Sequence, residues 1–96
     1  MIEQNGSGLR VSGPMLIADA PALLAAGRGF LRGLSGPEVL VDLAGVAEAD
    51  SSALGVIFAL QRSAHERGAA LRIVNPPAGL MSLAGLYGVA ETLPLA

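Results

Sequence analysis

The segment VLVDLAGVAEADSSALGVIFALQ, residues 39–61, has the pattern of a strand, a polar loop and a helix. Its first part alternates as a strand does, with one face formed by Val39, Val41 and Leu43. Near-continuous apolar character predicts a central strand that is covered on at least one face. After a short polar loop, apolar residues recur at helical spacing, which predicts a helix over 51–68 that stops at Gly68.

Strands and helices alternate on both sides of this segment. Residues 9–15 have the pattern of a strand, and residues 18–34 carry one apolar helical face. Residues 69–77 predict a strand closed by two prolines, and residues 78–95 a short helix and a tail. Because helices separate the strands, we expect parallel pairing with right-handed crossovers. Residues 1–7 are polar, so we expect them to be frayed, with only weak evidence for an additional strand there.

The expected first helix has a start that looks capped and a weak interior. Asp19 can cap its amino end, and Pro21 is tolerated in a first turn. Gly27 and Gly29 are each expected to weaken the helix by about 1 kcal/mol relative to alanine.

The composition excludes several classes of function. The 96 residues are enough for one small domain, so we expect a single domain over residues 1–96. The net charge of −2, with six arginines and no lysine, gives no patch basic enough to predict nucleic-acid binding. The absence of cysteine excludes disulfides, thiolate metal sites and cysteine nucleophiles. No apolar run approaches the ~20 residues that span a bilayer, and no signal-peptide pattern is present, so we expect no direct membrane insertion.

Catalytic arrangements also fail on spacing. His65 is the only histidine, and a triad of Ser51, His65 and Asp42 would have to span a helix that separates its first two members by roughly 20 Å. The glycine-rich run GRGFLRG, residues 27–33, lacks the lysine of a phosphate-binding loop. We therefore expect no enzyme activity, no catalytic residue, no metal site and no cofactor.

The polar loop Asp50-Ser51-Ser52 is the remaining candidate site. Either Asp50 or Ser51 can cap the helix that follows. A strand-to-helix loop also lies at the carboxyl edge of a parallel sheet, where open α/β folds place their function. We therefore expect Ser51 to be a partner-contact or phosphorylation site, supported in the loop and interface by Asp50, Ser52, Ala53 and Leu54.

The strand DLAGV, the loop and the helix start DSSALG, followed by LRIVNPP, resemble the STAS domain family, which includes the anti-sigma factor antagonists. The resemblance covers nearly the whole chain. It implies an α/β fold of SpoIIAA type, with a mixed, mostly parallel sheet of about four strands, a first strand antiparallel to the rest, and helices packed on one side. In the antagonists the hydroxyl after the loop aspartate is phosphorylated, and by motif position that hydroxyl belongs to Ser51.

Two departures from the antagonist pattern point to one sub-family. Ala53 stands where antagonists commonly have glycine, and GPMLIAD, residues 13–19, lacks the acidic pair of their GELD-like segment. The segment GPMLIADAPALL and the segment LMSLAGLYGVAETLPL, residues 80–95, are similar to STAS subunits of the MlaB type.

That similarity implies a non-enzymatic cytoplasmic subunit that binds and supports the ATPase of a phospholipid ABC transporter, in outer-membrane lipid asymmetry. The subunit would reach the inner face of the inner membrane through this partner, with Ser51 in the contact region. The alternative is an anti-sigma factor antagonist that is switched by phosphorylation of Ser51 and has a serine kinase as its partner. The sequence leaves both open.

Overall fold

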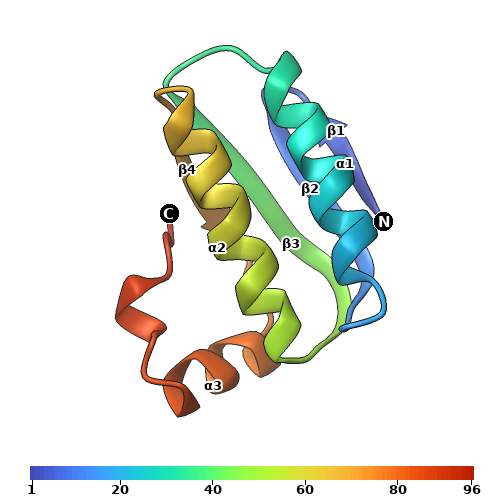
Figure 1. Cartoon of the computed structure of the whole chain (residues 1–96). Helices are drawn as coiled ribbons and strands as arrows, with labels where there is room; N and C mark the ends of the chain where they lie inside the picture. Colours follow the sequence, from blue (N-terminus) through green and yellow to red (C-terminus); the bar gives the residue numbers. More distant parts are fainter.

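A four-stranded mixed sheet forms the centre of the computed structural model, which describes residues 1–96 (Figure 1). In spatial order the strands are β1 (Ile2–Asn5), β2 (Gly8–Met15), β3 (Glu38–Ala49) and β4 (Ala70–Val74). β1 is antiparallel to β2, whereas β2, β3 and β4 are mutually parallel. The expected sheet, including its antiparallel first strand, is therefore confirmed.

The fraying expected over residues 1–7 is wrong, because this segment forms β1 and a tight hairpin. Ile2 pairs with Val11 and is only 7% exposed. Gly6, with a φ of 62°, begins the two-residue turn between Asn5 and Gly8. The rest of β1 is exposed at the edge of the sheet, so its polar composition hides its strand conformation.

The helices cover one face of the sheet and one of its ends. They are α1 (Ala20–Gly33), α2 (Ser51–Glu66) and α3 (Ala78–Leu86), followed by a 3-10 turn, η1 (Ala90–Thr92). Figure 1 shows α1 and α2 side by side on one face, with α3 beside the start of α2. None of these helices has both the length and the apolar character that crossing a bilayer requires.

The last residues of the chain form a single parallel bridge to β4, between Leu95 and Ile73. The amide of Ile73 donates to the carbonyl of Pro94 at 2.8 Å, and the amide of Ala96 donates to the carbonyl of Ile73 at 2.9 Å. A strand edge with free amides and carbonyls is a site of unwanted pairing, so this tail protects the β4 edge.

The predicted alternation of β3 is confirmed and sets the layer structure. Val39, Val41 and Leu43 are buried under the helices, whereas Leu40, on the opposite face, is 43% exposed. The core is aliphatic, as the low aromatic content requires, and no polar or charged residue is fully buried. One face of the sheet is thus packed, and the other is open.

Of the predicted helix ends, one is confirmed by the structure and one is wrong. Gly68 adopts a φ of 81° after α2, and its amide donates to the carbonyl of His65 at 2.9 Å, so the expected glycine stop is confirmed. Asp19 makes no side-chain bond to the amides of α1, and the expected cap is wrong. Its Oδ2 instead accepts from the amide of Leu16 at 3.0 Å and closes the loop before the helix.

Gly27 is the point where α1 packs closely on α2. A Cβ at this position would lie 2.7 Å from Cδ2 of Leu60, which is buried in the core. We predict that Gly27→Ala lowers the free energy of unfolding by about 1 kcal/mol, because overpacking costs more than helix propensity returns. Gly29→Ala is the matched control, because its Cβ would lie 3.7 Å from Arg32, at an ordinary contact distance. This substitution should stabilise the protein slightly. Urea denaturation measures both, and equal shifts would contradict this role of Gly27.

Candidate functional site

Asp50 joins two loops at the carboxyl ends of the parallel strands. It is the N-cap of α2, and its Oδ1 accepts from the amide of Ser52 at 2.8 Å. Its Oδ2 accepts from the amide of Ile17 at 3.0 Å, in the loop between β2 and α1. Of the two expected cap residues, Asp50 is therefore the one that caps. The same carboxylate fixes the start of α2 against a loop that lies 33 positions earlier in the chain.

These hydrogen bonds lower the pKa of Asp50 below its usual value of 3.8. The Ile17 amide contributes most, partial desolvation works in the opposite direction, and the Ser52 amide adds to the lowering. Donors that bind a carboxylate favour its charged form. Asp50 is thus an anion at neutral pH, which suits a clamp and not a general acid.

The clamp predicts an acid-dependent stability. Because the pKa of folded Asp50 is depressed, its contribution is complete above about pH 4 and is lost as the pH falls through the folded pKa. Asp50→Asn keeps a capping residue but loses the charge, so we predict a Tm below that of wild type at pH 7. The two Tm values should converge near pH 2. Scanning calorimetry at a series of pH values measures the Tm of each protein. Glu48→Gln is the control, because the Glu48 side chain makes no hydrogen bond. If the Tm of Asp50→Asn and that of wild type changed in parallel with pH, the clamp would be refuted.

Ser51 is the exposed first residue of α2, and its hydroxyl makes no hydrogen bond within the chain. The side chain of Ile17, whose amide is held by Asp50, is 73% exposed at the same end of the molecule. An unpartnered hydroxyl and a large apolar side chain therefore lie around one clamped loop. These two side chains carry no charge, and they offer a partner an apolar surface and a free hydroxyl.

A groove runs between the first turns of α1 and α2, next to this loop. Its volume is about 420 Å³, and it is lined by Ala20, Pro21, Leu24, Ser52, Gly55 and Val56. We call Ile17, Ser51 and this groove the docking end. Small residues on both helices keep the groove open, so that a partner's side chain could enter it.

Ala53 and Leu54 lie beneath the docking end. Their side chains are 1% and 6% exposed and pack in the core. They support the loop and α2 from below, and their burial leaves them almost no side-chain surface for the interface in which the sequence placed them. Sequence reasoning missed Ile17, although the apolar run Met15-Leu16-Ile17 continues past the end of β2 into the loop.

Asp42 and Asn75 form a second polar contact, on the open face of the sheet. Oδ1 of Asp42 accepts from the amide of Ala44 at 2.9 Å and from Nδ2 of Asn75 at 3.1 Å. These bonds, the Ala44 amide first, lower the pKa of Asp42 below 3.8. Asn75 is the only residue other than glycine with a positive φ, 54°, at the end of β4. The contact thus ties the end of β4 to β3.

The three residues of the triad weighed from the sequence are not brought together. His65 is exposed in the last turn of α2, at the opposite end of that helix from Ser51. No group of three or more His, Asp or Glu side chains comes together. The bonds of Asp42 hold it on the open sheet face, so Ser51, His65 and Asp42 do not form a triad.

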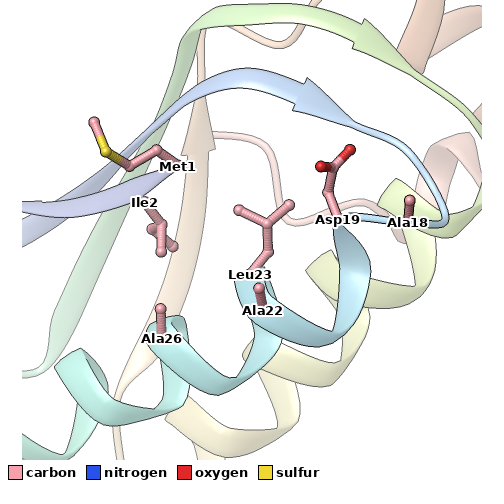
Figure 2. A pocket seen from close by; sticks show the side chains of 7 residues that line it. All are labelled: Met1, Ile2, Ala18, Asp19, Ala22, Leu23 and Ala26. Carbon is pink, nitrogen blue, oxygen red and sulfur yellow. The ribbon is translucent and has the colours of Figure 1, made fainter.

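A further pocket, of about 280 Å³, lies between β1 and α1 (Figure 2). Most of its wall is aliphatic, from Ile2, Ala22, Leu23 and Ala26. Asp19 is its only acidic side chain, and its carboxylate is already bonded to the amide of Leu16. No other ionisable side chain lines this pocket.

Comparison with known proteins identifies the family and the fold. The family model described as Mlab, STAS domain, matches residues 2–95. An anti-sigma factor antagonist from Mycobacterium paratuberculosis is similar in structure, with 24% identity, a TM-score of 0.74, and coverage of 99% of this chain and 81% of that one. A putative antagonist from Thermotoga maritima has 17% identity, a TM-score of 0.74, and coverage of 99% and 83%.

The antagonist SpoIIAA in its unphosphorylated form shares the fold as well, with 13% identity, a TM-score of 0.68, and coverage of 99% of this chain and 84% of that one. The predicted fold of SpoIIAA type is therefore confirmed. A search of curated protein sequences found no match.

Proposed function

The chain belongs to the STAS domain family, and from that premise we propose that it is a non-enzymatic accessory subunit of an ABC-type phospholipid transporter. In this role it binds the transporter's ATPase and supports its assembly and activity. The observation that carries the proposal is the match of residues 2–95 to the Mlab STAS model. STAS domains are typically regulatory or accessory modules that act through protein–protein contacts, which is the class of function that this chain's geometry suits.

The docking end supplies a surface of the right chemistry for such a partner. Ile17 offers exposed apolar area, and the α1/α2 groove offers a concave seat for a partner side chain. Contacts of this kind, a large side chain in a desolvated pocket, contribute most of the binding energy in protein interfaces. Asp50 holds the loop in place before the partner arrives, so little conformational entropy is lost on binding.

In this proposal the protein acts in the cytoplasm, at the inner face of the inner membrane, where the ATPase partner holds it. Its contribution to outer-membrane lipid asymmetry is indirect. The ATPase does the chemical work, and the subunit stabilises the ATPase through the docking end.

One observation favours a second candidate, an anti-sigma factor antagonist. The Ser51 hydroxyl is exposed and unpartnered at the start of α2, where a kinase could reach it. A phosphate there would gain from helix amides but would be repelled by the adjacent Asp50 carboxylate. In this alternative, the partner is a serine kinase that controls a sigma factor, and phosphorylation of Ser51 releases this chain from the kinase.

Affinity capture from a native extract of the source organism tests the proposal against the alternative. The tagged chain should recover an ABC ATPase, and a Ser51→Asp bait should recover much less of it. Recovery of a serine kinase in place of an ATPase would establish the second candidate. If the wild-type and Ser51→Asp baits captured the same proteins, neither candidate would act through the docking end.

A further inference from the structure

Three arginines converge at the end of the helix pair that lies opposite the docking end. Arg28 and Arg32, from the second half of α1, and Arg67, just after α2, line a groove of about 220 Å³. The chain has only six basic side chains and a net charge of −2, so half of its cations gather here. α2 separates this basic groove from Ser51 by roughly 24 Å.

Arg67 is the least satisfied of the three. Its Nε and Nη2 atoms are buried, and neither has a hydrogen-bond partner. They are the only buried side-chain nitrogen or oxygen atoms in the molecule without one. Buried polar groups in folded proteins are almost always bonded, and those of a charged group carry the largest desolvation penalty when they are not. The third nitrogen, Nη1, is also without a partner but is not buried, so it is the Arg67 atom that a ligand in the groove can contact.

Ser63 adds a polar atom to the same wall. Its Oγ accepts from Nε of Arg28 at 3.1 Å and donates to no group in the chain. The bond holds Nε of Arg28 and leaves both of its terminal nitrogens without a partner. The groove thus combines guanidinium forks with one hydroxyl donor.

The opposing charges do not neutralise this groove. Glu66 also lines it, yet it forms no ion pair, and the one salt bridge in the molecule, Arg72 to Glu38 at 3.8 Å, lies elsewhere. The carboxyl ends of α1 and α2 point their partial negative charge toward this region, which accounts for arginine being tolerated there. Each helix end contributes about half a negative charge, so roughly one unit of the groove's two excess positive charges remains.

We propose that the Arg28–Arg32–Arg67 groove binds a small phosphate-type anion. Guanidinium forks match the oxygens of a phosphate group and bind it through charge-assisted hydrogen bonds. Nη1 of Arg67, which is neither bonded nor buried, contacts one edge of the anion, Ser63 donates to another oxygen, and Arg28 and Arg32 provide charge. The aliphatic side chain of Leu31 forms the remaining wall.

The size of the groove restricts the ligand. Its volume lies below the range of about 300–1,000 Å³ that drug-sized ligands occupy, so a phosphate group fits better than a nucleotide. The phosphate is supplied either as the free ion or as the headgroup of a lipid. Because the groove lies at the opposite end of α2 from Ser51, binding there does not depend on the proposed ATPase contact.

Titration of the full chain with inorganic phosphate, at constant ionic strength maintained with chloride, tests the site. Two-dimensional amide NMR spectra should show saturable shifts around residues 28–32 and 63–67. Arg67→Gln should weaken the binding at least tenfold, and Arg32→Gln, at an exposed position, should weaken it several-fold without any risk to the fold. Arg72→Gln is the matched control, because Arg72 lies on the open sheet face, and it should leave the affinity unchanged.

Vesicle flotation identifies the source of the phosphate. Binding to phosphatidylglycerol vesicles, but not to phosphatidylcholine vesicles, that is lost in Arg67→Gln would assign the groove to a lipid headgroup. Phosphate binding without vesicle binding would assign it to the free ion. The proposal is overturned if wild type binds neither phosphate nor vesicles, or if Arg67→Gln and Arg72→Gln bind alike. Neither result bears on ATPase capture, so the two proposals fail separately.

Discussion

Ser51→Asp should weaken binding of the ABC ATPase by about 100-fold while leaving the fold intact. A carboxylate at this position would be desolvated in the interface without a partner, and it would stand next to the anionic Asp50. A 100-fold loss corresponds to about 2.7 kcal/mol, within the range for an unpaired charge at an interface. The helix itself should tolerate the change, because an acidic residue in the first turn interacts favourably with the helix dipole.

The control variants separate charge from shape. Ser51→Ala removes only an unbonded hydroxyl, so its affinity should stay within a few-fold of wild type. Ser35→Asp introduces the same charge at an exposed position between α1 and β3, at the far end of the molecule, and should have no effect. Isothermal titration with the purified ATPase measures all three. An unchanged affinity for Ser51→Asp would remove Ser51 from the interface.

Gly8→Ala should be among the most destabilising single changes outside the core, although it adds only one methyl group. Its Cβ would lie 2.3 Å from the backbone carbonyl oxygen of Leu40. Gly8 and Leu40 face each other because Leu9 pairs with Val41 in the β2–β3 register. A carbonyl in a central strand cannot move without breaking that register. We predict a loss of about 3 kcal/mol in the free energy of unfolding, the upper part of the usual range for overpacking.

Gly33→Ala is the control for this prediction, because a Cβ at that position meets nothing within 4 Å. Its free energy of unfolding should equal or slightly exceed that of wild type. Chemical denaturation followed by circular dichroism gives both values. A Gly8→Ala protein as stable as Gly33→Ala would show that β2 and β3 are not in the register described here.

The sequence predicts the fold well where burial alternates strongly and poorly where it does not. β3 and α2 are predicted because the apolar period changes from strand to helix across Asp50. β1 is missed because it is a short edge strand with one buried residue, Ile2, so no alternation can be seen. From the sequence alone, Gly27 is only a residue that weakens a helix. Its close contact with Leu60 cannot be predicted, because it depends on packing between distant segments.

In the candidate site too, local features are predictable from the sequence and long-range contacts are not. Asp50 and Ser51 are predictable from the strand–loop–helix motif, because capping and exposure are local properties. The bond from Ile17 to Asp50 and the groove between α1 and α2 depend on contacts about 30 positions apart, which local patterns do not specify. The burial of Ala53 and Leu54 likewise follows from how α2 rotates onto the sheet.

Amide hydrogen exchange of the chain with and without the ABC ATPase tests whether the partner binds at the docking end. Added ATPase should slow exchange in the loop around Ile17 and in the first turns of α1 and α2. Exchange on the open face of the sheet and around Arg67 should be unchanged. Protection confined to the open sheet face, with the amides around Ile17 and Ser51 exchanging as in the free protein, would contradict the docking end as the functional surface.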